Sequence, residues 1–340
     1  MPTSPLPPRF EYSPTPTVSV ILPVYNEADF IEGCLKAILN QDYPHDRLEV
    51  LVVDGGSTDS TRAVVEKLIN AYPYLRLLDN PERLQAYALN RGIQAASGEI
   101  IIRVDGHTII APDYVSQCVS LLRRMSDQGV VNVGGLMRPE GQTPAGKAIA
   151  AATMSPFAVP TAFHHSDRAQ FVDTVYLGAW PRKLFDVVGM FNPAVNVNED
   201  YEFNYRTRQA GGKIYLSPDI RSTYFPRSSF GALWRQYFRY GVQKAQMLKL
   251  HPGALRMRQI VAPTFVTASM GLPLLGFLWQ GAWGLWGVML LAYFTVSAVA
   301  AARQREAEVS PLLIMGAFFI IHTAWGLGFW RGLVKPSAQP

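Results

Sequence analysis

The sequence predicts an α/β domain with a doubly wound, mostly parallel sheet, followed by C-terminal transmembrane helices. Two observations predict this fold class. Up to residue 227, apolar runs rich in Val, Ile and Leu alternate with helical patterns, and strands that alternate with helices form right-handed crossover units. From residue 259 onward, long stretches lack charged residues and could cross a bilayer.

Five apolar runs are assigned to strands, and helical patterns separate most of them. The runs lack polar alternation, which is typical of strands buried on both faces, as in a parallel sheet. Residues 31–39 and 64–72 keep one apolar face at helical spacing, and two more helical patterns lie between residues 181 and 211. The predicted strands are Val18–Val24, Leu48–Val53, Leu75–Leu78, Glu99–Val104 and Val130–Leu136.

Charge and composition narrow the possible partners. The chain has 31 Lys+Arg against 26 Asp+Glu, a formal net charge of +5, with no long basic run. This balance argues against nucleic-acid binding and favours contact with anionic lipid headgroups. Residues 1–16 are Pro-rich and hold no apolar core segment, so we expect an extended leader rather than a secretory signal, and a cytoplasmic α/β domain.

The C-terminal third is predicted to associate with a membrane. Residues 228–258 carry apolar and aromatic side chains on one side and Arg and Lys on the other, as amphipathic interface helices do; the alternative is a surface helix of the soluble domain. Residues 259–334 are predicted to hold about three hydrophobic segments, which makes the protein a multi-pass protein of the inner (plasma) membrane. The alternative is a set of buried soluble helices.

Three membrane crossings would conflict with the distribution of positive charges around the segments. The positive-inside rule places Arg256, Arg258 and the loop Arg303–Glu306 in the cytoplasm. Three crossings would then put the C-terminus outside, which Arg331 and Lys335 oppose. A third segment that re-enters the membrane or lies in its interface would remove the conflict.

Three acidic positions predict the chemistry. Asp54 in VVDGGSTDST and Asp105 in IIIRVDGHT stand where predicted strands end, and open α/β sheets bind ligands at that edge. Two carboxylates there suit a diphosphate held through Mn²⁺ or Mg²⁺. Asp200 in NVNEDYEF could take a proton from an attacking hydroxyl. Together they predict a transferase that uses a sugar nucleotide at a membrane.

The segments VSVILPVYNE, VVDGGSTDST, RVDGHT and NEDYEFNYR resemble family 2 glycosyltransferases with a GT-A fold, over about residues 16–250. RVDGHT and the few C-terminal membrane segments resemble the bacterial ExoA-type (succinoglycan biosynthesis) branch. The resemblance implies a GT-A catalytic domain over residues 17–227. It also implies an inverting, metal-dependent transferase that moves a sugar from a nucleotide sugar, with a UDP-sugar as the expected donor, to a polyprenyl-linked glycan in exopolysaccharide or cell-surface glycan assembly.

The resemblance also assigns the donor-binding residues. The turn after the first strand would hold the base and ribose, Asp54 would accept the uracil imide proton, and Asn90 would lie near the nucleotide or its phosphates. Other roles stay open, because Ser57 is also typical of a helix N-cap region and Asn90 could be a solvated helix residue. The implied donor set is Pro23, Tyr25, Glu27, Asp54, Gly55, Ser57, Asn90 and Asp105.

Asp105 and His107 occupy the family's D-x-D position, and His107 replaces the second Asp. The resemblance implies that Asp105 binds the divalent metal that bridges the diphosphate. Imidazole can ligate Mn²⁺ but suits Mg²⁺ less well. His107 is therefore a candidate metal ligand, and the alternative is a histidine that supports the site or packs in the core.

The resemblance implies that Asp200, beside Glu199, is the catalytic base; the alternative for this pair is an ordinary acidic helix start. Trp180 could stack on a sugar ring or pack in the core. Residues 236–240 read Q-x-x-R-Y and resemble the Q-x-x-R-W of polysaccharide synthases; here snorkelling at an interface is the alternative. The implied acceptor or diphosphate residues are Trp180, Gln236, Arg239 and Tyr240.

Two other functions stay open at this point. Transfer directly to a polyprenyl phosphate would need a base less, because that acceptor is already an anion. A membrane-anchored, non-catalytic sugar-nucleotide sensor or scaffold would explain the incomplete D-x-D. The sequence gives no indication of the oligomeric state.

Overall fold

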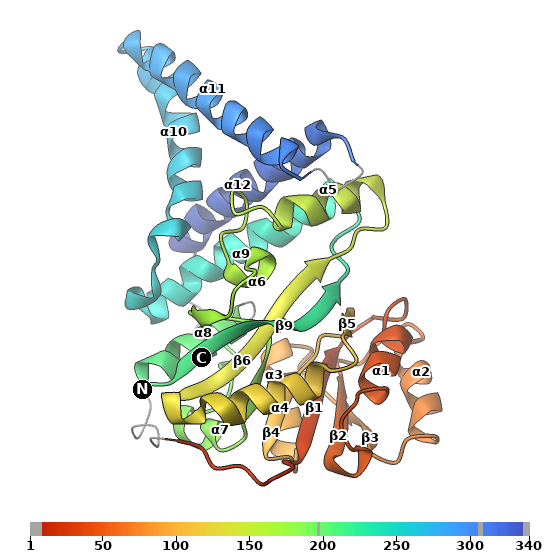
Figure 1. The fold of residues 1–340 in the computed structure, drawn as a ribbon. Coiled ribbons are helices and arrows are strands. Elements are labelled where there is room, and N and C mark those ends of the chain that lie inside the picture. Colours follow the sequence, from red (N-terminus) through yellow and green to blue (C-terminus); the bar gives the residue numbers. More distant parts are fainter. Residues whose placement is uncertain (1–8, 196–197, 305–308, 336–340) are drawn as a thin grey trace. The chain divides into compact units, whose positions relative to one another are not determined.

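The computed structural model of the protein describes residues 9–195, 198–304 and 309–335 (Figure 1). The chain forms two compact units: the sheet unit (Met1–Arg138 with Ser166–Tyr224) and the helical unit (Pro139–His165 with Phe225–Pro340). Residues 139–165 group with the helical unit, although the sequence analysis assigned them to the α/β domain. Residues 1–8 of the predicted leader and residues 305–306 of the predicted loop lie outside the described residues.

Within the described residues, the sheet unit contains one mixed sheet of nine strands in the order β3-β2-β1-β4-β8-β6-β9-β5, and β7 pairs with β9. The pairs β1–β2, β1–β4 and β2–β3 are parallel. The pairs β4–β8, β6–β8, β5–β9 and β7–β9 are antiparallel. The strands are β1 (Val18–Val24), β2 (Leu48–Asp54), β3 (Leu75–Asp79), β4 (Ile100–Arg103), β5 (Thr108–Ile110), β6 (Val130–Pro139), β7 (Gln170–Val172), β8 (Tyr176–Pro181) and β9 (Lys213–Tyr224).

Helices cover both faces of the parallel part, as the doubly wound prediction requires. Val20 and Val50 join one buried cluster with α1, α2 and α4. Ile21 and Leu51, one position further along β1 and β2, join a second cluster with α3, α7 and α8, because successive side chains of a strand point to opposite faces. The helices are α1 (Ile31–Leu39), α2 (Thr61–Ile69), α3 (Gln85–Ala95), α4 (Tyr114–Met125), α7 (Leu184–Val188) and α8 (Glu199–Gln209).

The sheet departs from the sequence analysis in its second half. The first four predicted strands form the parallel part, but the fifth, Val130–Leu136, lies in β6 and runs antiparallel to β8. β8 is in turn antiparallel to β4, so β6 points in the same direction as the parallel strands but is separated from them by β8. An apolar run indicates burial on both faces and carries no information about which strand lies beside it. β8 enters the sheet between β4 and β6.

In the described part of the helical unit, three helices are long and apolar enough to cross a membrane: Met257–Gly276, Gly281–Ala302 and Pro311–Val334. α9 packs along α12, and α5 packs on α12 as well. Figure 1 shows α10 and α11 extending away from the layer formed by α5, α9 and α12. The helices of this unit are α5 (Pro144–Thr153), α6 (Ala162–His165), α9 (Phe230–Leu250), α10 (Val261–Gly276), α11 (Gly281–Ala302) and α12 (Pro311–Val334).

Candidate active site

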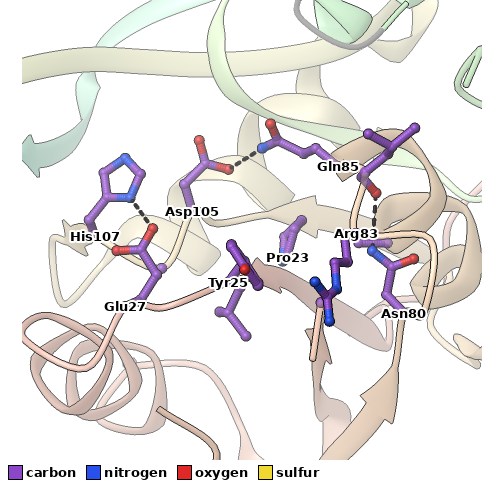
Figure 2. A pocket seen from close by; sticks show the side chains of 13 residues that line it. Pro23, Tyr25, Glu27, Asn80, Arg83, Gln85, Asp105 and His107 are labelled. Carbon is purple, nitrogen blue, oxygen red and sulfur yellow. Dashed lines mark hydrogen bonds and ion pairs between the residues drawn. The ribbon is translucent and has the colours of Figure 1, made fainter. Parts of the chain in front are cut away.

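A pocket of about 170 Å³ lies where β1, β2, β3 and β4 end (Figure 2). β1 lies between β2 and β4, so the strand order reverses beside it. This is the switch point at which open α/β sheets bind ligands. The predicted site edge is therefore the edge that carries the pocket. Its lining residues are Pro23, Val24, Tyr25, Glu27, Gly55, Asn80, Arg83, Leu84, Gln85, Ala88, Asp105, Gly106 and His107.

Five of the predicted donor residues line this pocket, namely Pro23, Tyr25, Glu27, Gly55 and Asp105. Pro23 is near the end of β1, and the others follow β1, β2 and β4. Tyr25 is exposed. Figure 2 shows the side chains of Pro23, Tyr25, Glu27 and Asp105 around one opening.

Asp54 and Ser57 lie beside the pocket and do not line it. Asp54 is 1% exposed. Its Oδ1 accepts hydrogen bonds from the Ser57 N–H at 3.1 Å and the Ser57 hydroxyl at 2.6 Å, and Arg62 Nη1 lies 3.5 Å from Oδ2. Gly56 between them has φ 73°, a left-handed conformation that glycine adopts without strain. Asp54 thus shapes the loop that presents Gly55, and its contact with the base stays a prediction.

Asn90 does not line the pocket, and its predicted place near the nucleotide stays a prediction. Its Nδ2 donates to the Phe191 carbonyl at 2.8 Å, and its Oδ1 accepts from the Phe191 N–H at 2.9 Å. The amide is therefore used inside the protein, where it ties α3 to the segment that leads into α8. Nothing in the local sequence of a helix indicates that a polar side chain will form hydrogen bonds with such a distant segment.

Trp180 is a core residue, so the structure favours aromatic packing over the predicted contact with the acceptor. The side chain is 1% exposed. Its ring lies edge-on to Phe185, Phe191 and Phe203, with centroids 6.0–6.1 Å apart. Aromatic packing, the alternative given above, is the role observed here.

The structure brings Asp105 and the Glu199-Asp200 pair together through a residue that the sequence analysis did not select. Arg103, at the end of β4, is 7% exposed. Its Nε and Nη2 donate to the two carboxylate oxygens of Asp105 at 2.7 and 3.2 Å, and its Nη1 donates to Glu199 Oε1 at 2.9 Å. A charged residue at the end of the apolar run IIIR was the available signal.

Burial and charge shift the pKa values of this cluster. Burial favours neutral Asp105, but the adjacent Arg103 outweighs it and holds the pKa of Asp105 below its ordinary value. Burial raises the pKa of Glu199 to about 7, although Arg103 opposes this shift. Burial also raises the pKa of Asp200, whose Oδ1 accepts a hydrogen bond from the Tyr201 N–H at 2.7 Å. One guanidinium thus faces three carboxyl groups.

The donor set at the pocket fits a divalent metal that is completed by substrate oxygens. Asp105, Glu27 and His107 line the same opening, and His107 Nδ1 lies 2.9 Å from Glu27 Oε1 (Figure 2). Among the described residues, no three His, Cys, Asp or Glu side chains are arranged as a metal cage. Mg²⁺ in nucleotide sites commonly uses one or two carboxylates plus phosphates, with no protein cage. The surplus of carboxylates over cations also favours a positive ligand.

Two further polar residues line the pocket. Arg83 lines the pocket beside Tyr25, with its guanidinium carbon 5.9 Å from the ring centroid. Its φ of 58° is unusual for a residue other than glycine. Gln85, at the start of α3, donates to Asp105 Oδ1 at 3.4 Å. Arg83 is a cation that could meet phosphate oxygens.

The predicted Q-x-x-R-Y residues belong to α9 of the helical unit. Gln236 Nε2 donates to Tyr240 Oη at 2.8 Å, and Arg239 is exposed. Their role toward an acceptor or diphosphate stays a prediction.

The chain is similar in sequence to known glycosyltransferases. The Glycosyl transferase family 2 model matches residues 19–146. Glycosyltransferase AglE of Haloferax volcanii is 32% identical over 72% of this chain and 78% of its own length. The succinoglycan biosynthesis protein ExoA of Rhizobium meliloti is 28% identical over 93% of this chain and 94% of its own. A third relative, from Methanococcus voltae, is 26% identical over 94% of this chain and 98% of its own length. It is named a dolichyl N-acetyl-α-D-glucosaminyl phosphate 3-β-D-2,3-diacetamido-2,3-dideoxy-β-D-glucuronosyltransferase.

Solved structures support the fold. A mannosyltransferase from Pyrobaculum calidifontis in complex with GDP-Man and Mn²⁺ has a TM-score of 0.57 and 24% identity, covering 96% of this chain and 90% of that chain. TarS of S. aureus (1–349) in complex with UDP has a TM-score of 0.53 and 19% identity, covering 93% and 91%. The predicted GT-A fold and the resemblance to ExoA are confirmed. The chain belongs to glycosyltransferase family 2.

Proposed function

We propose that this protein is an inverting, metal-dependent glycosyltransferase that moves a sugar from a UDP-sugar to a lipid-linked glycan at the cytoplasmic face of the inner membrane. The observation that carries the proposal is the link through Arg103 between pocket residue Asp105 and Glu199 of the Glu-Asp pair. The donor pocket and the candidate base thus belong to one charged cluster. A site that only binds a nucleotide would not need the Glu-Asp pair.

Asp200 is the proposed base. Inversion by one in-line displacement needs a group that removes the proton of the acceptor hydroxyl. Burial raises the pKa of Asp200, which makes its carboxylate a stronger base than an exposed one. Glu199 is the positioning partner, because its side chain is 3% exposed and held by Arg103.

Asp105 and His107 would hold the metal, which would neutralise charge on the departing diphosphate. Arg83 lies at the same opening and would contact phosphate oxygens through its planar guanidinium. Arg103 donates hydrogen bonds to both carboxylate oxygens of Asp105. These hydrogen bonds fix the orientation of the Asp105 carboxylate toward the pocket.

The pocket is large enough for part of a nucleotide sugar. A volume of about 170 Å³ is below the roughly 300–1,000 Å³ of sites that enclose a whole small ligand. Proteins of this fold have been solved with GDP-Man and with UDP, so the choice of nucleoside requires a direct test.

A lipid-linked acceptor is supported by two findings. The name of the Methanococcus voltae relative describes a dolichyl N-acetylglucosaminyl phosphate acceptor. The helical unit carries three helices that are apolar enough to enter a membrane, which would bring acceptor and site together. The Glu-Asp pair favours a hydroxyl acceptor over a bare polyprenyl phosphate.

The test uses the full-length chain in native membranes with UDP- and GDP-sugars and polyprenyl-diphosphate glycans. We expect nucleoside diphosphate release that depends on the acceptor, and a lipid product heavier by one sugar in mass analysis. Chelation should stop both signals, and added Mn²⁺ should restore them. Donor binding without any glycolipid product, across all donors and acceptors, would refute the proposal.

A further inference from the structure

The three apolar helices of the helical unit differ in what covers them. In their most apolar stretches, α10 with its preceding turn is 17% buried, α11 is 11% buried and α12 is 44% buried. α12 packs on α5, α9, α10 and α11. Most of the apolar surface of α10 and α11 is therefore exposed, whereas much of the surface of α12 is packed against other helices.

The contact between α9 and α12 is close and long. A Cβ atom at Gly241 would overlap the Trp325 carbonyl, and one at Gly328 would overlap the Phe238 carbonyl. The backbones therefore touch where glycine leaves room for them. These contacts make α9 and α12 one rigid pair.

The pair also has a defined direction. Phe238 meets Gly328, Val242 meets Gly332, and Lys249 Nζ donates to the Lys335 carbonyl at 2.5 Å. Residue numbers rise together on both helices, so the helices run parallel. Any tilt or depth that α12 adopts in a membrane is imposed on α9 as well.

α9 carries charges that do not belong in a hydrocarbon layer. Arg235 and Arg239 are exposed, and the pairing just described places them beside the second half of α12. If α12 crossed a core of roughly 30 Å, residues near Gly328 would lie only about 8 Å from its centre, at about 1.5 Å rise per residue. Arg239 would then sit within the hydrocarbon, where an ionised side chain is strongly unfavourable.

The first half of α12 is tied to polar groups as well. His322 Nε2 bonds to the Phe157 carbonyl at 2.9 Å, and Phe157 belongs to the segment after α5. α5 carries the exposed Lys147 and packs on α12. The whole length of α12 is thus bound to elements that carry charged side chains.

We infer that α12 lies along the membrane surface with α9 and does not cross the bilayer, so that the C-terminal end lies on the same side as the start of α10. The occupant of its exposed face is lipid, because Leu312, Phe319 and Trp330 are exposed apolar residues that share one face at spacings of seven and eleven residues. This removes the conflict with Arg331 and Lys335. It holds whether the α10–α11 hairpin crosses the membrane or turns back within it.

Depth measurements in phospholipid vesicles test this inference. Single cysteines at Leu312, Phe319 and Trp330 of the full-length chain receive a nitroxide label, and collisions with oxygen and a water-soluble nickel chelate report depth. Cys34 and Cys118 are 0% exposed, so labelling reports the introduced sites. We expect three equal, shallow depths. A label at Phe319 that is roughly 10 Å deeper than one at Leu312, as seven residues of a crossing helix require, would overturn the inference.

Matched labels on α11 serve as the control. Leu285, Leu291 and Val299 are exposed and should differ in depth, because α11 enters the membrane at a steep angle. Reporter fusions at both ends of the full-length chain provide a second readout. A fluorescent protein should be active at both ends, and an exported phosphatase at neither. Phosphatase activity at the C-terminal end alone would contradict the inferred topology.

Discussion

Arg103 links Asp105, two residues further along the chain, to Glu199 at the start of α8, which is remote in sequence. A buried ion pair adds little stability over an apolar substitute, but removing one partner leaves a costly buried charge. The value of Arg103 therefore lies in the geometry it imposes on both carboxylates. It sets how the pocket and the proposed base face each other.

The role of Asp200 is tested by Asp200→Asn. Asparagine keeps the size and can cap a helix, but it cannot accept a proton at neutral pH. We expect donor binding to survive while transfer falls by roughly 10²–10⁴-fold, the range for lost general base catalysis. Single-turnover rates at saturating donor measure this. The matched control is Asp186→Asn on α7, where the carboxylate is exposed; near-normal transfer by Asp200→Asn would exclude the proposed mechanism.

Glu199 predicts a pH dependence of stability. Its pKa rises from 4.5 to about 7 in the folded protein, so the folded state binds more protons than the unfolded state between these values. Stability should therefore fall as pH rises from about 5 to 7.5. In Glu199→Gln this component is absent, so the melting temperature of the variant should decline less than that of the wild type. Parallel declines in scanning fluorimetry would mean that Glu199 is already ionised in the fold.

The sequence could predict those site residues that lie in a local motif. Asp105 stands after a buried strand and the Glu199-Asp200 pair begins a helix, so both belong to motifs that the sequence displays. The internal contacts of Asn90 and Trp180 could not be predicted, because their partners Phe191 and Phe203 are distant in sequence and leave no local pattern. Tertiary contacts of this kind are what a motif search does not register.

Among elements, the parallel strands and their helices could be predicted because uninterrupted apolar runs mark them. β9 was missed because its sequence, KIYLSPDIRSTY, mixes polar residues and a proline with the apolar ones. Its first half pairs with β7 and its last residues with β5. Such a strand depends on its neighbours for its conformation, and composition alone does not reveal them.

The α9–α12 contact predicts opposite effects for two glycines of the same helix. Gly328→Ala would drive a methyl group into the Phe238 carbonyl, whereas Gly316 has open space around it. We expect Gly328→Ala to destabilise the protein by about 1–3 kcal/mol through overpacking. Gly316→Ala should stabilise it by roughly 0.5–1 kcal/mol, because alanine is the better helix former. Thermal unfolding in one detergent compares them; equal effects would mean that the helices separate in solution.

At the scale of the whole molecule, the two units divide the proposed task. The pocket and the charged cluster lie entirely in the sheet unit, and the apolar helices lie in the helical unit. The units are not consecutive along the chain, because residues 139–165 interrupt the sheet unit. The segment is rich in Ala and Pro, but this composition does not reveal the unit against which it packs.

A chain that ends at Leu250 tests this division. It retains all residues of the pocket, so nucleotide binding measured by calorimetry should stay within about threefold of the full chain. Transfer to membrane-embedded acceptor should fall at least about tenfold, because the apolar helices are missing. The uncovered faces of α5 and α9 should also make this chain aggregate in size-exclusion chromatography. Full transfer activity by this shortened chain would show that the helices are dispensable.

The order of synthesis gives the interrupted arrangement a further consequence. α5 leaves the ribosome well before α12, the helix on which it packs. Its Ala-rich surface, with Ala148, Ile149 and Ala152 buried in the finished protein, must therefore stay uncovered while the rest of the sheet unit, α9 and the hairpin are made. The nascent chain is exposed to misassembly in this interval, and early contact of α5 with the bilayer surface would shield it until α12 arrives.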